Sequence, residues 1–162
     1  MRQAGFATLI LVLTGMAPAA GVAGSEATDR QIEFLDGCLA GATDTGEDLG
    51  RCVGSLSQPC KQRPENQSNQ GVVACYQIEE SAWDTLRRRF EAQLGDGLDG
   101  EEARAALLAS DEAWRAYREE SCALSHVVAP DDAALVWAAA CQCEKTAERA
   151  IDLYRLLPLV GF

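Results

Sequence analysis

The chain has 162 residues, of which 48% are hydrophobic and 24% are charged, and this composition excludes a disordered or collagen-like protein. A formal net charge of −11 argues against nucleic acid or an anionic membrane surface as partner and favours a basic partner. Seven cysteines accompany a single histidine, so disulfides are favoured over mixed cysteine and histidine zinc sites if the chain is exported.

Residues 1–23 have the pattern of a signal peptide. Arg2 supplies a basic start, and the apolar run 6–13 is too short for a membrane-spanning helix, which needs about 20 residues. Small residues at Gly21 and Ala23 predict cleavage after Ala23. The remaining chain, 24–162, is then expected to be one periplasmic or secreted domain without a membrane anchor. Its net charge would be −12, because 13 basic residues remain against 25 acidic ones.

The first part of this domain is expected to contain short helices. Apolar residues recur at intervals of three and four, and no strand-like alternation is sustained, so the chain is predicted to be mainly α-helical. One helix should begin after the N-cap Thr28 and stop at Gly41. A second short segment is predicted over 47–56, followed by a polar, proline-containing loop up to residue 70.

Two longer helices are predicted next, as an antiparallel hairpin. The first spans roughly 72–94, with Glu79 interrupting its apolar stripe, and ends in the glycine-rich turn 95–100. Asp99 is expected to cap the second helix together with Glu102. The face that packs on the first helix is predicted to consist of Ala103, Leu107, Ser110, Trp114, Tyr117 and Ser121.

A last long helix is predicted between Pro130 and Pro158, with acidic residues in its first turn. Its expected buried face consists of Leu135, Ala139, Thr146, Ala150, Leu153 and Leu157. Helical phase also places Cys143 on this face, and Cys141 on its flank. The Cys141-Gln142-Cys143 motif is not expected to bind a metal, because residues two apart on a helix point about 200° apart.

Sequence spacing favours disulfides between neighbouring cysteines. The predicted pairs are Cys38 with Cys52, Cys60 with Cys75, and Cys122 with either Cys141 or Cys143. Helical phase alone would select Cys143 for the last pair, because it is the one expected to be buried. Each disulfide is expected to contribute roughly 3 kcal/mol by restricting the unfolded chain.

One spaced motif runs through the three long helices. It consists of Cys75, Trp83-Asp84, Trp114-x-x-Tyr117-Arg118-x-x-x-Cys122 and Cys141-x-x-x-x-Thr146-x-x-Arg149-x-x-x-Leu153. The motif resembles the LprI-like lysozyme-inhibitor domain, a family of small exported bacterial proteins. The resemblance covers about 60–156, with 28–59 as a cysteine-containing extension. It implies an all-α, disulfide-stapled bundle with a long helical hairpin and a C-terminal helix, and it implies Cys141 as the partner of Cys122.

The chain departs from the family pattern after the tryptophan region. Members usually carry Leu-Asn where this sequence has Arg87-Arg88, and these arginines are expected on a solvated helix face, with Arg87 paired to Glu91. The rings of Trp114 and Tyr117 are expected in the core. The remaining motif arginines, Arg118 and Arg149, are expected to pair with carboxylates such as Asp84 or Glu79.

The resemblance implies an exported inhibitor or binder of lysozyme-type cell-wall hydrolases, whose cationic surface would suit an acidic chain. Two regions are candidate contacts for such a partner: the acidic turn with Asp96, Asp99, Glu101 and Glu102, and the connection between Cys122 and Cys141 that contains His126. The alternative is a disulfide-stabilised envelope interaction protein without a hydrolase target.

An enzyme is disfavoured by the sequence. His126 lies beside no recognisable nucleophile motif, and no glycine-rich phosphate loop occurs. An acid pair such as Glu79 with Asp84 is the remaining possibility for glycosidase chemistry. The acidic turn lacks the ligand spacing of a calcium loop, so no metal site is predicted there. No catalytic residue and no cofactor are predicted either.

Overall fold

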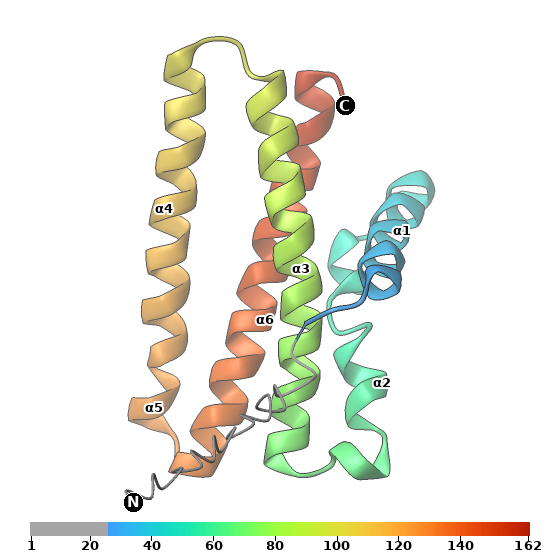
Figure 1. Cartoon of the computed structure of the whole chain (residues 1–162), viewed down its shortest axis with the longest axis vertical. Coiled ribbons are helices and arrows are strands. Elements are labelled where there is room, and N and C mark those ends of the chain that lie inside the picture. Colours follow the sequence, from blue (N-terminus) through green and yellow to red (C-terminus); the bar gives the residue numbers. More distant parts are fainter. Residues whose placement is uncertain (1–25) are drawn as a thin grey trace, which may run out of the picture.

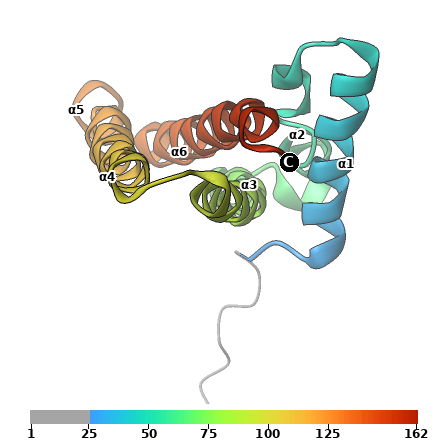
Figure 2. The ribbon, with the colours of Figure 1, turned by 90° about the horizontal axis from the view of Figure 1, so that it is seen from above.

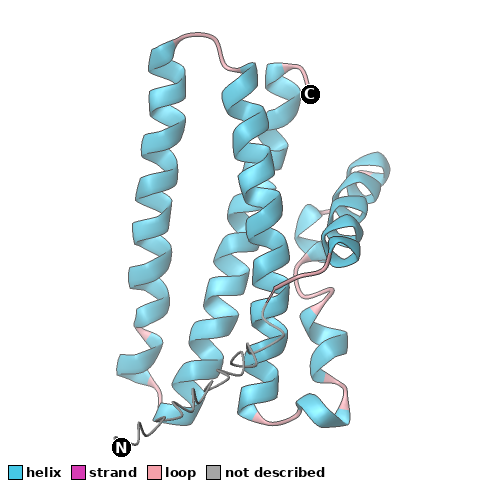
Figure 3. Ribbon diagram, in the orientation of Figure 1, coloured by secondary structure: helices cyan, strands magenta, loops and turns pink. Residues whose placement is uncertain are grey.

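The computed structural model describes residues 26–162, and the predicted signal peptide lies outside the described residues. The described chain is all-α and contains no strand (Figure 3), which confirms the predicted fold class. The α-helices are α1 (Asp29–Thr45), α2 (Ser57–Lys61), α3 (Asn69–Gly97), α4 (Glu101–Ala123), α5 (Ser125–Val128) and α6 (Asp131–Leu156). Three 3-10 helices are η1 (Leu49–Cys52), η2 (Pro64–Asn66) and η3 (Leu157–Val160). None of these helices is long and apolar enough to cross a membrane.

The long helices α3 and α6 lie side by side at the centre of the molecule (Figures 1 and 2). On one side they are flanked by α4 and α5, and on the other by α1 and α2. Trp83, Leu86 and Phe90 of α3 are buried at this centre together with Ala147 and Leu153 of α6. The apolar stripes of the two helices therefore build most of the core, as amphipathic helices do when their apolar faces meet.

The first helix begins as predicted and ends later. Thr28 caps α1 in a capping box with Gln31, which satisfies backbone groups at the helix start. The predicted stop at Gly41 is wrong, because the helix continues one more turn and buries Ala42. Gly46 ends it instead, with φ of 70°, a left-handed conformation that glycine adopts without strain.

The predicted helical segment 47–56 is also wrong in its bounds. Within 47–56 only η1 is helical. Helix α2 begins at Ser57, in the stretch predicted as a loop, and includes Pro59 in its first turn, where proline is tolerated. Gly54 turns the chain between them with φ of 87°. The carboxylate of Glu79 on α3 holds this turn, since it accepts hydrogen bonds from the backbone N–H groups of Gly54 (2.6 Å), Leu56 (3.2 Å) and Ser57 (2.6 Å).

Helices α3 and α4 form the antiparallel hairpin, but α4 packs loosely on α3 and more closely on α6. In α4 the buried residues are Asp111 and Cys122, whereas Ser110 and Tyr117 of the predicted packing face are exposed. Capping by Asp99 is wrong as well. Gly100 is the N-cap, with φ of 87°, and no side chain caps the helix.

Leu135 departs from the predicted buried face of α6, because 55% of it is exposed. The first turns of α3 and α6 leave a groove between them, and Leu135 lines this groove. The rest of the predicted face is buried, namely Ala139, Thr146, Ala150, Leu153 and Leu157.

Three disulfides connect the elements. Cys38–Cys52 joins α1 to η1, Cys60–Cys75 joins α2 to α3, and Cys122–Cys141 joins α4 to α6. Cys143 is buried, as helical phase predicts, but it is unpaired. Burial was a wrong criterion for the last pair, because Cys141 on the flank of α6 is the one that faces α4.

Candidate functional site

Polar contacts between α4 and the central helices form a cluster that we call the α4 seam. It consists of Glu80, Arg87, Asp111, Trp114, Arg118 and Thr146. Its members come from α3, α4 and α6, and they include Trp114, Arg118 and Thr146 of the family motif. Since few apolar side chains of α4 are buried, these contacts and the Cys122–Cys141 disulfide position α4.

Arg87 is the centre of the α4 seam. Its side chain is only 3% exposed, so the prediction of a solvated arginine is wrong, although the predicted contact with Glu91 exists at 2.9 Å. It also contacts Asp84 of its own helix at 2.9 Å and Asp111 of α4 at 2.7 Å. Three carboxylates around one buried guanidinium compensate its charge. Arg88 is mostly exposed, as expected.

The two motif rings of α4 lie outside the core, contrary to prediction. Trp114 is half-buried, with the guanidinium carbons of Arg87 and Arg118 at 5.1 and 5.0 Å from its ring centroid. Each arginine is therefore within cation–π distance of the Trp114 ring. Tyr117 is 55% exposed, and the ammonium of Lys145 lies 5.5 Å from its ring centroid.

The motif arginines use partners other than the predicted ones. Arg118 donates to the carboxylate of Glu80 at 3.1 Å and to the hydroxyl of Thr146 at 2.9 Å. Arg149 donates to the hydroxyl of Ser110 at 3.0 Å. Both arginines thus connect α4 to its neighbours, and neither contacts the predicted Asp84 or Glu79.

Burial raises the pKa of Glu80, against the opposing effect of Arg118. The folded protein therefore keeps a proton on this carboxyl at pH values where the unfolded chain has lost it. The stability that Glu80 contributes relative to Glu80→Gln should be fully present below the ordinary glutamate pKa of about 4.3 and be lost as pH rises through the raised pKa. Urea unfolding of both proteins from pH 4 to pH 7, with Glu33→Gln as an exposed control, measures it. If the wild type instead became more stable relative to Glu80→Gln as pH rises, this assignment would be contradicted.

The predicted acidic contact region lies at the turn between α3 and α4. We call Asp96, Asp99, Glu101 and Glu102 the acidic tip, and all four are exposed. Among the described residues none of them forms an ion pair. The nearby Arg104 donates instead to the backbone carbonyl of Gly95 at 3.1 Å. A Cβ on Gly97 would lie 2.8 Å from Val160, so the turn packs closely against the C-terminal segment.

His126 is exposed on α5 and does not join the acidic tip. The two lie at opposite ends of α4, whose 23 residues span about 34 Å (Figure 1). The two candidate regions are therefore separate surfaces, one near each end of α4.

Other reactive groups of the described chain are buried or dispersed. Residues 26–162 contain no group of three or more histidine, cysteine or acidic side chains that could hold a metal. Burial raises the pKa of the Cys143 thiol, so it stays protonated and poorly nucleophilic. The Glu79 side chain of the proposed acid pair is fully buried, and it also accepts a hydrogen bond from the Trp83 indole at 3.1 Å.

Sequence reasoning missed the roles of Glu79 and Arg87. Both are charged residues within the apolar stripe of a long helix, and that position is the signal that could have found them. A charge at such a place is stable only with dedicated partners, which here are backbone N–H groups for Glu79 and carboxylates for Arg87.

Comparison with known proteins gives one family. The family model described as "Lysozyme inhibitor LprI" matches residues 60–153, which is more than half of the chain. No curated protein and no solved structure matches. The matched region begins at Cys60 and includes α3 to most of α6, so the α4 seam and the acidic tip both lie within it.

Proposed function

We propose that this chain, which belongs to the LprI family of lysozyme inhibitors, binds and inhibits a cationic cell-wall hydrolase of the lysozyme type. The family match is the observation that carries the proposal. Inhibitor families of this kind act by binding, so the protein needs a surface for the hydrolase and no catalytic group of its own.

The place of action that we propose is the periplasm or the exterior of the cell. Three disulfides favour an oxidising compartment, and residues 1–23 have the composition of a signal peptide. Cell-wall hydrolases act in the same compartments, so inhibitor and target would meet there.

The acidic tip is the surface that we propose to meet the hydrolase first. Its four carboxylates are exposed and unpaired among the described residues, and they lie at the turn of the helical hairpin. Because no neighbouring cation neutralises these carboxylates, their negative potential attracts a cationic protein and raises the rate of association. The tip lies at one end of the bundle (Figure 1), where a partner protein can reach it.

Neutralising the acidic tip tests this assignment. The variant Asp96→Asn, Asp99→Asn, Glu101→Gln and Glu102→Gln is expected to bind a lysozyme with an association rate about tenfold lower at low salt, and with a weaker salt dependence. Stopped-flow or surface-based kinetics at two salt concentrations measures both. Inhibition of lysis should weaken in parallel.

A matched control separates the tip from net charge. Asp29→Asn, Glu33→Gln, Asp44→Asn and Glu65→Gln also remove four exposed, unpaired carboxylates, away from the tip. The control should change the association rate much less. Equal rates for the two variants would overturn the role of the acidic tip while leaving inhibition itself intact. Capture of an envelope protein other than a hydrolase, with no effect on lysis, would favour the alternative of a general interaction protein.

A further inference from the structure

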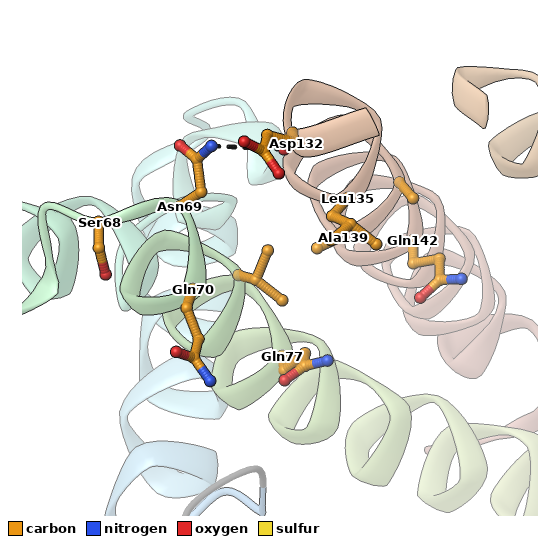
Figure 4. Close-up of a pocket in the computed structure, with 10 residues that line it drawn as sticks. Ser68, Asn69, Gln70, Gln77, Asp132, Leu135, Ala139 and Gln142 are labelled. Carbon is orange, nitrogen blue, oxygen red and sulfur yellow. Dashed lines mark hydrogen bonds between the residues drawn. The ribbon is translucent and has the colours of Figure 1, made fainter. Parts of the chain in front are cut away.

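A groove of about 660 Å³ lies between the first turns of α3 and α6 (Figure 4). It is at the end of α3 opposite the acidic tip, about 40 Å away by the length of that helix. Figure 4 shows Gln70 and Gln77 projecting from α3 and Gln142 from α6, with Leu135 and Ala139 between them. The volume is within the usual range of ligand sites.

Three glutamine amides line the groove without hydrogen-bond partners among the described residues. Gln70, Gln77 and Gln142 are exposed, and each offers N–H donors and a carbonyl acceptor. Asn69 behaves differently, since its amide donates to the backbone carbonyl of Asp132 at 3.5 Å and joins the two helices at one end (Figure 4). The glutamines therefore remain available to a ligand that both donates and accepts.

The spacing of these amides matches an extended polypeptide. Gln70 and Gln77 are seven residues apart on α3, a rise of about 10.5 Å. Three residues of an extended chain span about 10 Å and present an N–H and a carbonyl at each residue. Primary amides pair with such peptide groups in both directions.

The apolar residues of the groove are small or shallow. Val73 and Ala139 line it together with Leu135, which is 55% exposed although it is large and apolar. This surface can receive a small apolar side chain. No aromatic ring lines the groove, so a sugar ring finds no aromatic face for stacking.

The charge at the groove favours a basic ligand. Asp132 lines it and Asp131 is exposed next to it, while none of its lining residues is cationic. With a net charge of −11, the chain also repels acidic ligands, including a second copy of itself.

We propose that this groove binds an extended polypeptide segment in which a small apolar residue is flanked by basic ones. The amides of Gln70, Gln77 and Gln142 pair with its backbone, Leu135 and Val73 contact its apolar side chain, and Asp132 contacts a basic side chain. The site is independent of the proposed function, because it lies at the other end of the bundle and requires no hydrolase.

Titration of the oxidised, ¹⁵N-labelled protein tests the proposal with acetyl-Lys-Ala-Val-Ala-Lys-amide as the probe. The side-chain amide signals of Gln70, Gln77 and Gln142 should shift saturably, with Kd of about 1 mM or tighter. The signal of Gln58, which is exposed on α2, should not move. Acetyl-Glu-Ala-Val-Ala-Glu-amide should bind at least several-fold more weakly.

Two variants locate the binding. Ala138→Phe fills the groove from α6 and should abolish the shifts, whereas Ala106→Phe places the same ring on the exposed face of α4 and should leave them unchanged. Gln142→Ala removes one amide from an exposed position and should weaken binding several-fold without affecting the fold. Equal binding of the acidic peptide, no shift at about 10 mM of the basic one, or shifts with chitotriose instead would each overturn the proposal. None of these results depends on whether a lysozyme binds.

Discussion

Glu79→Gln is expected to lower the free energy of unfolding by about 3 kcal/mol. The side chain is fully buried, and its carboxylate accepts three backbone N–H groups and the Trp83 indole. Hydrogen bonds to a charged acceptor are the strong ones, and a glutamine would turn an NH₂ group toward donors. Urea unfolding of the oxidised protein measures the loss.

Amide hydrogen exchange gives the specific signature of this substitution. Exchange at Gly54 and Ser57 should accelerate in Glu79→Gln, because these N–H groups lose their acceptor. Glu33→Gln replaces an exposed glutamate on α1 and should change stability by less than about 0.5 kcal/mol. A loss in Glu79→Gln no larger than in this control would show that the buried carboxylate does not hold the Gly54 turn.

Arg87→Met is expected to destabilise the protein by about 3 to 5 kcal/mol. It removes the cation that faces Asp84, Glu91 and Asp111 and leaves the buried Asp111 without its compensating partner on α3. The contact between α3 and α4 should therefore weaken first. Chemical denaturation measures the total, and faster hydrogen exchange in the middle of α4 would locate it.

A second substitution distinguishes lost charge compensation from lost packing. Asp111→Leu added to Arg87→Met removes a buried carboxylate that would keep only the exposed Arg115 as its partner, at 2.6 Å, and should recover part of the stability, as apolar replacement of buried ion pairs often does. Arg88→Met serves as the control, because Arg88 is mostly exposed and, among the described residues, forms an ion pair with Asp84 alone. Its loss should stay below about 1 kcal/mol. Equal losses in Arg87→Met and Arg88→Met would contradict a central role for Arg87.

Periodicity in the sequence predicted the helices whose apolar stripes are long. The predicted helix 72–94 lies within α3, and the last predicted helix corresponds to α6, because many buried residues define each phase. The short elements were predicted less well. Their bounds depend on Gly54 and on the distant Glu79, and a contact across 25 residues is invisible to local patterns.

The sequence could predict which residues belong to the candidate regions, but it could not predict how these residues are arranged in space. The sequence located the acidic turn, yet only the fold separates it from His126 by the length of α4. The rings of Trp114 and Tyr117 were predicted in the core because aromatic residues on a helix face usually pack there. In this chain α4 is attached by arginines and carboxylates, so these rings remain partly exposed.

Calorimetric titration of the oxidised mature protein against a lysozyme, at moderate and high salt and with a parallel lysis assay, tests the central claim most directly. Inhibition predicts stoichiometric binding with Kd of about 1 μM or tighter and loss of lysis, with affinity falling as salt rises. Binding without loss of lysis would show that the two proteins associate by charge attraction without inhibition. Absence of binding at both salt concentrations would contradict inhibition of that lysozyme.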